Sequence, residues 1–529
     1  MDGTQRKIGM QSWLSFELDG IPRRVEGMPM HVTLASYLDG RGCGNGRYAQ
    51  ADRWLGGAPV ILLDADSEGL AVYRTVDSAR LLLPQIEGTV IYTAEGILRL
   101  GGPDHPVVRA LQNHPELETE PSACAAWLIA LFEAYYRPDL KNRQQLRSQL
   151  DLVISRTVDP AALEAAAKEV LEEAHTRLAK PHRSSAGPGG QAQDRYGDAF
   201  SAVLFRPMPE AADFVYVDDA KRRYYRPQTV MELLRLKAQY REARLVSGGG
   251  SFADRAKAGD TWPALISLDG VSELRLSIAH PDHWEVGAAV TLTALEEALG
   301  EEMPALAKML RRHGTRAVRN RASIGGHLVA ADPRSDLAPL LMALDARIVL
   351  TGLEGEREAP LSSFFETDRR TILRPGEILR SVLIPRFTQE LLGARGCSTR
   401  CCDYYKVAAR RQNLPGVVSA AFAIELDHQH LIRKAWLAYS GVTDRPIRAR
   451  QAEASLVGKP WNEATLVATL RPLDQEVAAA GDELATREYR RQLVVTLFQK
   501  FFYQHPHPEQ AEPVELGATL EFLRPAEAC

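Results

Sequence analysis

Hydrophobic and polar positions alternate near the start of the chain in the pattern of a β-hairpin. Apolar residues from Leu14 to Leu18 are separated by polar ones, and Asp19-Gly20 follows as a turn signal before a second strand around Val25. The other elements predicted here are one helix and two strands, over residues 33–38, 59–63 and 89–93. Together these patterns predict a small α+β unit that ends near residue 100.

From about residue 105 the spacing of apolar residues becomes helical. One apolar-faced helix is predicted over 125–136. Asp159-Pro160 combines an N-cap residue with a first-turn proline, and it predicts another helix that runs past Val170. Residues 180–211 are rich in Pro, Gly, Ser and Gln, and we interpret them as a linker of low order.

Strand and helix patterns alternate in the second half of the chain. Strands are predicted over 244–246, 284–290, 417–426 and 432–439. Helices are predicted over 229–240, 292–310, 449–456 and 486–503. The 529 residues are enough for about three or four domains of roughly 100–200 residues, and the pattern predicts a multidomain α+β protein.

Composition and charge exclude several classes of protein. Hydrophobic residues make up 45% and charged residues 25% of the chain, as in soluble globular proteins. The net charge of -4, with both signs mixed, favours neither nucleic acid nor an anionic membrane as partner. No apolar run approaches the roughly 18 residues of a membrane span, and residues 1–11 are too polar for a signal peptide. We therefore expect a cytoplasmic protein.

Cysteine is scarce, with six residues and no CxxC or CxC pair, which excludes a disulfide scaffold. The cysteines are Cys43, Cys124, Cys397, Cys401, Cys402 and Cys529. Cys397, Cys401 and Cys402 have the spacing C-x3-C-C in a predicted loop. A metal site, a redox-sensitive surface cluster and three ordinary thiols all remain open for them, although no fourth ligand stands at zinc spacing.

Two glycine turns carry the candidate chemistry. The first, Gly248-Gly249-Gly250, directly follows a predicted strand, where backbone N–H groups can converge on an anion because no Cβ obstructs them. The second, Gly325-Gly326, lies within Arg319 to Leu328, and the acidic Asp336 follows about ten positions later. Alone, a glycine turn of the first kind is more often a plain loop, and the second is also consistent with a surface turn near a charged loop.

Taken together, the two turns resemble the FAD-carrying small subunit of xanthine dehydrogenase and related molybdenum hydroxylases. That family has a phosphate loop close to V-A-G-G-T-D and a stretch close to R-N-x-x-T-I-G-G-N, followed by S-P-x-x-D and P-x-L. The residues that match the second stretch in order are Arg319, Asn320, Ser323, Ile324, Gly325, Gly326, Pro333, Asp336, Pro339 and Leu341. The resemblance extends over roughly residues 222–460, where 287–291, 374–379, 405–407 and 410–411 also fit.

The resemblance implies a bound FAD. The residues at its binding positions are Leu245, Val246, Ser247, Gly248, Gly249, Gly250, Ser251, Phe252, Ser323, Gly326, His327, Asp336, Ile378 and Lys406. It implies that 245–252 wrap the pyrophosphate and that Ser323, Gly326 and His327 form a second phosphate contact. Asp336 would bond sugar or ribityl hydroxyls. Ile378 would pack near the flavin or adenine, and Lys406 would lie near the isoalloxazine edge.

The resemblance also implies a division of the chain. The expected parts are a ferredoxin-like β-grasp domain (1–100), a helical domain (101–179), a linker (180–211), a two-part α/β FAD-binding domain of the PCMH type (212–395), a C-terminal α+β domain like that of the CO dehydrogenase flavoprotein (396–515) and a tail (516–529). In the family the first two domains each hold a [2Fe-2S] cluster through four thiolates.

Nearly every cluster ligand is absent at the expected positions. Cys43 stands at the start of the first motif. The remaining ligand positions fall on Tyr48, Ala51, Ala79, Glu120, Ala123, Val153 and Ser155, and Cys124 is one position late. Because alanine and valine supply no donor, we expect neither cluster to form, with Cys124 as a small apolar residue on a buried helix face.

The flavin motif also departs from the family pattern at several positions. Gly250 and Ser251 replace a threonine and an acidic residue, and His327 replaces the asparagine after Gly-Gly. His313 stands where the family has a stacking aromatic residue, and 412–415 replaces an acidic stretch. Each lost buried hydrogen bond costs about 1 kcal/mol in net terms. These changes together would therefore weaken FAD binding unless Ser251 and His327 compensate.

The resemblance implies three functional alternatives. In the family, a separate large subunit with a molybdenum cofactor oxidises the substrate, and electrons pass through the clusters to FAD and then to an acceptor such as NAD. Without clusters, this chain is predicted to be the FAD-binding subunit of a molybdenum hydroxylase with its N-terminal domains kept as docking surfaces. The alternatives are a non-catalytic pseudo-subunit for assembly or regulation and a stand-alone FAD oxidoreductase.

Overall fold

The computed structural model describes most of residues 10–505. The stretches outside the description within this range are 41–57, 67–68, 138–139, 141–142, 153–154, 156–157, 180–197, 205–206, 209–211, 251, 253–254, 256–258, 395 and 410–413. The predicted site residue Ser251 and the thiol Cys43 lie in these stretches, and Cys529 lies beyond residue 505.

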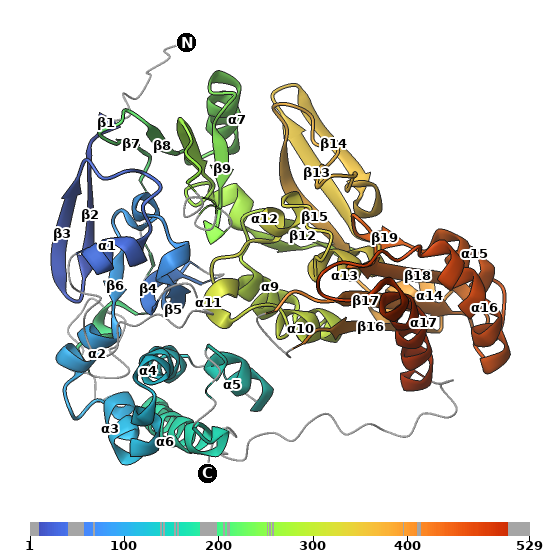
Figure 1. The fold of residues 1–529 in the computed structure, drawn as a ribbon, viewed down its shortest axis with the longest axis horizontal. Coiled ribbons are helices and arrows are strands. Elements are labelled where there is room, and N and C mark those ends of the chain that lie inside the picture. The colour runs from blue at the N-terminus through green and yellow to red at the C-terminus, as the bar shows by residue number, and fades with distance from the viewer. Residues whose placement is uncertain are drawn as a thin grey trace.

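The N-terminal unit is built on a five-stranded sheet of order β3-β2-β6-β4-β5 (Figure 1). Its strands are β2 (Trp13–Leu18), β3 (Ile21–Glu26), β4 (Pro59–Ala65), β5 (Ala71–Asp77) and β6 (Val90–Tyr92). β2 and β3 confirm the predicted hairpin, and its turn residues Asp19 and Gly20 both have positive φ, 53° and 76°. The sequence pattern missed β5 because almost all of its residues are buried, so polar and apolar positions do not alternate.

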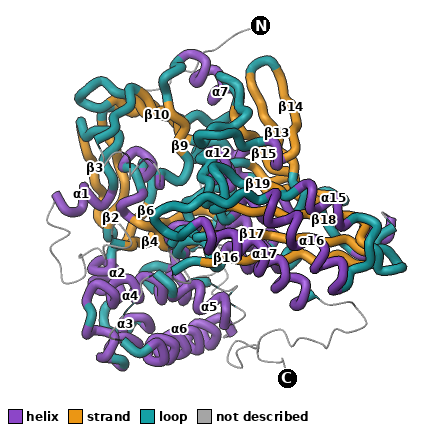
Figure 2. The backbone as a smooth tube through the Cα atoms, turned by 45° about the vertical axis from the view of Figure 1, so that its right-hand side comes forward, coloured by secondary structure: helices purple, strands orange, loops and turns teal. Residues whose placement is uncertain are grey.

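Helices cover this sheet and continue into a bundle. They are α1 (Leu34–Gly40), α2 (Ala94–Gly101), α3 (Pro106–Asn113), α4 (Pro121–Tyr135), α5 (Arg143–Leu150) and α6 (Pro160–Ala179). Figure 2 shows α3 to α6 gathered at one end of the molecule. The central helix α4 is buried nearly all around, and Asp159 caps the start of α6 by accepting a hydrogen bond from the Ala161 N–H at 2.9 Å. This end cap confirms the predicted start of that helix.

The described end of the predicted linker is packed. Phe200 is buried against Tyr92 and Phe132, and its carbonyl oxygen accepts a hydrogen bond from the Tyr73 hydroxyl at 2.7 Å. The prediction of low order is therefore wrong for residues 198–204, because one aromatic anchor outweighs a polar, glycine-rich composition there. Residues 180–197 lie outside the description.

The middle of the chain contains two further sheets. The first, of order β1-β7-β8-β10-β9, comprises β1 (Met10–Gln11), β7 (Phe214–Val217), β8 (Arg223–Arg226), β9 (Arg244–Val246) and β10 (Ala264–Ser267). The second, of order β11-β12-β15-β13-β14, comprises β11 (Ser277–Ala279), β12 (His283–Gly287), β13 (Arg347–Gly352), β14 (Gly355–Pro360) and β15 (Ile378–Pro385). The accompanying helices are α7 (Val230–Gln239), α9 (Leu292–Leu299), α10 (Pro304–Leu310), α11 (Arg316–Arg319), α12 (Ile324–Val329), α13 (Leu337–Ala343) and α14 (Gln389–Ala394).

The C-terminal unit is an antiparallel sheet with helices on one face. Its strands are β16 (Thr399–Val407), β17 (Val418–Leu426), β18 (Ile432–Ser440) and β19 (Ile447–Arg448), and its helices are α15 (Arg450–Leu456), α16 (Glu463–Glu476) and α17 (Arg487–Gln504). One face of the sheet joins the core around α13, and the other packs on α15 to α17. The middle and C-terminal units therefore share a core.

The predicted cysteine loop is a strand. Cys401 and Cys402 are neighbours on β16, so their side chains point to opposite faces, and each packs against a different core. Cys397 is buried before the strand. The prediction of a loop cluster of three thiols is wrong, because strand geometry separates adjacent side chains. Among the described residues, no group of three or more His, Cys, Asp and Glu residues could hold a metal ion.

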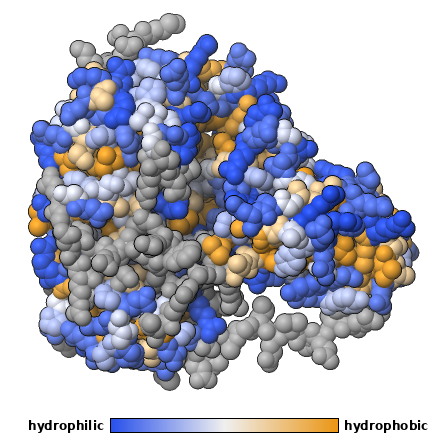
Figure 3. All heavy atoms as spheres, in the orientation of Figure 1, coloured by the Kyte–Doolittle hydropathy of each residue, from blue (hydrophilic) through white to orange (hydrophobic). Residues whose placement is uncertain are grey.

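None of the described helices is both long and apolar enough to cross a bilayer. On the face drawn in Figure 3, apolar residues are scattered among polar ones.

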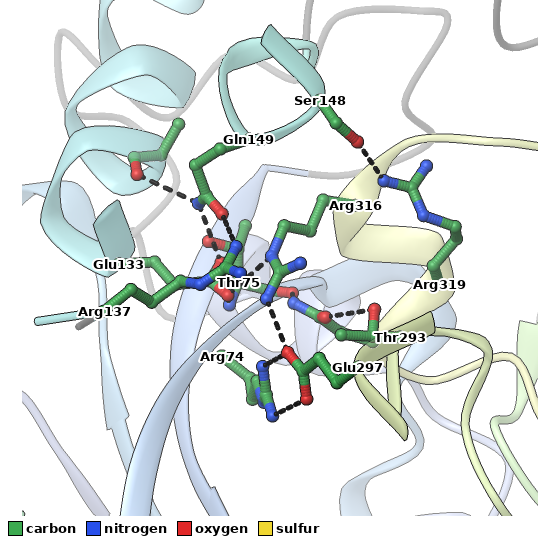
Figure 4. Close-up of polar contacts among 12 residues, drawn as sticks. Arg74, Thr75, Glu133, Arg137, Ser148, Gln149, Thr293, Glu297, Arg316 and Arg319 are labelled. Atoms are coloured by element: carbon green, nitrogen blue, oxygen red, sulfur yellow. Dashed lines mark hydrogen bonds and ion pairs between the residues drawn. The ribbon is translucent and has the colours of Figure 1, made fainter. Parts of the chain in front are cut away.

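A buried carboxylate joins three parts of the fold. Glu133 on α4 accepts hydrogen bonds from Arg316 Nε at 2.8 Å, from the Thr75 N–H at 3.0 Å and from Gln149 Nε2 at 3.1 Å (Figure 4). These partners come from α11, β5 and α5. Burial by itself raises the pKa of Glu133, but the positive charges of Arg316 and neighbouring arginines outweigh it and lower the pKa to about 2.

A second set of contacts surrounds this centre. Arg74 on β5 makes a two-pronged ion pair with Glu297 on α9, at 2.7 and 2.8 Å, and Arg316 also reaches Glu297 at 3.3 Å. Arg319 donates to Ser148 at 2.6 Å, and Asn320 donates to the Thr75 carbonyl oxygen at 2.8 Å. These polar contacts fix the N-terminal unit, the helical bundle and the middle unit against one another.

We predict that Glu133→Ala destabilises the whole chain by about 3–5 kcal/mol, because it leaves buried arginine and backbone donors unpaired. The free energy of unfolding from urea titration checks this. Glu172→Ala on α6 is the matched control, since Glu172 is half exposed and pairs only loosely with Lys168 at 3.7 Å. A change for Glu133→Ala no larger than that for the control would contradict the role assigned to this carboxylate.

Candidate functional site

The first glycine turn follows β9 and requires glycine at two positions. A Cβ on Gly248 would overlap the carbonyl oxygen of Arg321. Gly249 has φ of 81°, and a Cβ there would lie 2.6 Å from the carbonyl oxygen of Arg80. Only glycine permits this close approach without strain. The predicted strand over 244–246 is confirmed as β9.

The backbone N–H groups of this turn are a separate feature of the site. Phe252 donates its N–H to the Gly249 carbonyl oxygen at 3.0 Å, which closes the turn. No hydrogen bond joins the N–H groups of Gly248, Gly249 and Gly250 to an acceptor in the described part of the chain. Successive N–H groups of this kind form a concavity for a phosphate or another anion.

The N-terminal unit holds the turn from the opposite side. Gln85 donates from Nε2 to the Ser247 carbonyl oxygen at 2.7 Å and to Asp269 at 2.9 Å. Arg321, which follows Arg319 and Asn320, donates to the same Asp269 carboxylate at 2.9 Å. The turn is thus wedged between the N-terminal unit and the segment before α12.

The second glycine turn is the start of α12. Ser323 is its N-cap and accepts a hydrogen bond from the Gly326 N–H at 3.1 Å. Ile324 and Gly325 donate their N–H groups to the carbonyl oxygens of Val290 and Ala288, at 3.0 and 2.9 Å. A Cβ on Gly325 would lie 2.6 Å from Ala288, so this glycine is required for packing. The structure therefore gives Ser323, Gly325 and Gly326 partners within the protein.

Asp336 is the centre of a buried polar cluster. Its Oδ1 accepts from the hydroxyls of Tyr404 and Ser419 at 2.9 and 2.8 Å. Its Oδ2 accepts from Lys406 Nζ at 2.7 Å and contacts His313 Nδ1 at 2.9 Å. Burial by itself raises the pKa of Asp336, but the contacts with His313 and Lys406 outweigh it and hold the pKa well below its usual range. The carboxylate is ionised and engaged by four side chains.

His327 extends this cluster toward α12. Its Nε2 lies 2.8 Å from the Ser335 hydroxyl, and its ring meets the ring of His313 edge-on at 4.8 Å. Burial lowers the pKa of His327 to about 3, and the neighbouring His313 acts in the same direction. His327 is therefore neutral at physiological pH, and it acts as a hydrogen-bonding group without charge.

Most of the predicted site residues lie in one continuous region. The first turn contacts the segment before α12, and α12 leads through His327 and His313 to Asp336 and Lys406. Ile378 lies apart from this polar line, because it is buried in the apolar core beneath β8, β9 and β10. Ser251 lies outside the described residues.

Sequence patterns missed several residues of this region. They are Arg80, Gln85, Tyr404 and Ser419. Arg80 and Gln85 come from the N-terminal unit and reach the turn only in three dimensions, so no local signal marks them. On the paired strands β16 and β17, Tyr404 lies opposite Ala421 and Ser419 lies opposite Lys406. Only the pairing of those strands brings the Tyr404 and Ser419 hydroxyls to Asp336.

The described cluster-ligand positions hold groups that are satisfied within the protein. Glu120 accepts a hydrogen bond from the Ser155 hydroxyl at 2.7 Å, so two positions far apart in sequence meet in space. Ala79 and Ala123 are buried, and Cys124 is buried in the core around α4. The remaining positions, Cys43, Tyr48, Ala51 and Val153, lie outside the described residues.

Two protein families match adjoining parts of the chain. Residues 219–387 match the FAD binding domain in molybdopterin dehydrogenase. Residues 403–505 match the CO dehydrogenase flavoprotein C-terminal domain. Our finer division of the chain into domains stays a prediction.

Two curated relatives illustrate how far the similarity extends. The chain is 24% identical over 540 residues to xanthine dehydrogenase from Emericella nidulans, which covers 93% of this chain and 38% of the relative. It is 33% identical over 294 residues to aldehyde oxidase 2 from Mus musculus, which covers 53% of this chain and 21% of the relative. The chain thus spans well under half of either relative, and the first alignment also includes most of its N-terminal half.

Solved structures resemble about half of the chain. Quinoline 2-oxidoreductase from Pseudomonas putida 86 is 25% identical with a TM-score of 0.48, over 53% of this chain and 95% of the solved one. Carbon monoxide dehydrogenase from Hydrogenophaga pseudoflava is 24% identical with a TM-score of 0.48, over 52% of this chain and 94% of the solved one.

We predict that the neutral, half-buried His327 makes the fold acid-sensitive. Its pKa is about 3 in the folded chain against an ordinary value of 6.5, so the unfolded state takes up the proton first as the pH falls. The stability is present above pH 6.5 and is lost progressively toward pH 3. Between about pH 7 and about pH 5, the free energy of unfolding should therefore fall by about 1–2 kcal/mol less in His327→Asn than in the wild type.

Urea denaturation at a series of pH values measures this difference. His428→Asn is the control, because His428 is exposed. Parallel pH profiles for the wild type and His327→Asn would show that His327 is protonated or accessible in the fold, contrary to the prediction.

Proposed function

The chain carries the FAD-binding flavoprotein domain of the molybdopterin hydroxylases, and on this premise we propose that it is the FAD-binding component of a xanthine-dehydrogenase-like molybdenum hydroxylase without iron–sulfur clusters of its own. The observation that carries the proposal is the glycine turn after β9. It combines positions that tolerate only glycine, Gly248 and Gly249, with N–H groups that bond to no described acceptor. The diphosphate of FAD is an anion that such a nest fits.

The other parts of the site fit the cofactor to different degrees. Residues 245–252 would hold the diphosphate, and Ser323, Gly326 and His327 would face it from α12. When bound, FAD exchanges electrons in pairs or singly, and the protein supplies its position and electrostatic surroundings. Lys406, held by Asp336 and by the Arg312 carbonyl oxygen at 3.1 Å, keeps a positive charge at a fixed buried position. Such a charge favours a neighbouring group that gains negative charge.

The loss of both clusters is a separate part of the proposal. Glu120 and Ser155 satisfy each other across the second ligand set, and Ala79 offers no donor in the first. Cys124 lies in an apolar core, where a thiol behaves as a small hydrophobic side chain. Electrons from a molybdenum-containing large subunit would then need clusters supplied by another partner, with NAD as the candidate acceptor. The substrate would be selected by that large subunit.

One observation favours a second candidate function. All four hydrogen bonds to the Asp336 carboxylate come from the protein itself. A carboxylate engaged in this way must release a partner before it accepts a flavin hydroxyl. A pseudo-subunit that docks on a hydroxylase without binding flavin would keep this cluster as a structural support only.

FAD binding separates the two candidates. We predict that the purified chain, incubated with FAD and then desalted, retains the flavin with its yellow absorbance. Gly249→Val should abolish retention, because the side chain would enter the space of Arg80 and Gln85 at a backbone φ of 81°. Gly393→Ala is the control, since a Cβ there meets nothing within 4 Å.

Thermal unfolding of the variants without FAD shows whether Gly249→Val still folds. A wild-type chain that stays colourless after exposure to FAD would reject the flavoprotein proposal and leave the pseudo-subunit. Equal retention by the wild type and by a folded Gly249→Val would show that FAD binds elsewhere.

A further inference from the structure

Resting on the proposed FAD site, we propose that Arg80 of the N-terminal unit is a ligand of the flavin diphosphate. The nest after β9 supplies uncharged N–H donors, and a diphosphate carries negative charge. A guanidinium beside the nest would complete the site, because arginine pairs with phosphate through two parallel N–H donors.

Arg80 lies directly against the glycine turn. Its Nη1 is 3.3 Å from the position that a Cβ would take on Gly250, and its carbonyl oxygen closely approaches Gly249. The Arg80 side chain is 34% exposed, so it borders solvent as well as the turn. The absence of a side chain at Gly250 is what makes room for the guanidinium.

Local structure fixes this arginine in place. Arg80 ends a short 3-10 helix, Ser78–Arg80, whose N-cap Asp77 accepts from the Ala79 N–H at 2.9 Å. Asp77 also pairs with Arg80 Nε at 3.3 Å. Nε is thus the atom that orients the guanidinium, whereas Nη1 is the atom that faces the turn.

The same turn is attached firmly to the rest of the N-terminal unit. Ser78 donates its hydroxyl to the Ala58 carbonyl oxygen at 2.6 Å, and Leu34 donates its N–H to the Leu81 carbonyl oxygen at 2.8 Å. A few residues on, Gln85 binds the Ser247 carbonyl oxygen. Arg80 is therefore presented to the nest by a rigid frame, which reduces the entropy lost when it binds a phosphate.

Arg321, the other arginine at the turn, does not serve in this way. Its side chain is 15% exposed and pairs with Asp269 at 2.9 Å. Its carbonyl oxygen, and not its charge, meets Gly248. Arg80 is thus the arginine whose guanidinium borders the nest.

This assignment gives the N-terminal unit a role that needs no cluster. The turn 77–81 stands where the resembled enzymes carry the last thiolate of the first cluster, with Ala79 at that position. Its next residue would bind the cofactor directly. Flavin binding and docking of the N-terminal unit would then be coupled through one side chain.

Titration of the full chain with FAD and with riboflavin, followed by flavin fluorescence at two salt concentrations, tests the assignment. Arg80→Gln should lower the affinity for FAD about ten- to hundredfold and reduce the salt dependence of binding. It should leave the weaker binding of riboflavin unchanged, because riboflavin lacks the diphosphate. Arg80→Lys keeps the charge without the two-pronged geometry, so its FAD affinity should lie between that of the wild type and that of Arg80→Gln.

Arg24→Gln is the matched control, because Arg24 is exposed on the same unit and pairs with Glu26. Wild-type affinity of Arg80→Gln for FAD would overturn the assignment of Arg80 and leave the flavin site standing. An equal loss for FAD and riboflavin would also overturn it, since the effect would then be structural. A wild-type chain that binds no FAD would overturn both the site and the assignment. If Arg80→Gln fails to fold, Arg80→Lys decides, and unchanged FAD affinity and salt dependence in that variant would count against the proposal.

Discussion

The fold depends on neutralising one buried carboxylate. Glu133 is fully enclosed, and an unpaired charge at such a depth costs several kcal/mol. Its partners Arg316, Thr75 and Gln149 come from the middle unit, the first sheet and the helical bundle. These parts must therefore assemble together.

That constraint gives the N-terminal units a structural role in a protein proposed to lack iron–sulfur clusters. Docked through Glu133 and the Arg74–Glu297 pair, the first sheet places Gln85 and Arg80 against the glycine turn. The turn itself fits an anion, whereas Asp336 at the far end of the site is already saturated by the protein. The phosphate end of the proposed flavin site is thus better suited to its ligand than the Asp336 end.

Local sequence rules predicted the elements that local chemistry determines. The hairpin around Asp19-Gly20, the helix that begins at Pro160 and the strand before the glycine turn are confirmed. β5 was missed, since burial on both faces removes the alternation on which prediction depends. The start of β16 was missed as well, although its residues are only partly buried. The site was predictable only where a motif is continuous in sequence. Arg80, Gln85, Tyr404 and Ser419 depend on contacts between distant segments, which a single sequence does not display.

The central claim is a flavin site in a chain without clusters, and anaerobic reconstitution tests it most directly. The chain is incubated with FAD, ferrous iron and sulfide, desalted, and examined by visible absorbance and iron analysis. We predict flavin bands with no retained iron. Retained iron and sulfide with the broad absorbance of a [2Fe-2S] cluster would contradict the loss of the clusters, and a colourless product would contradict the flavin site.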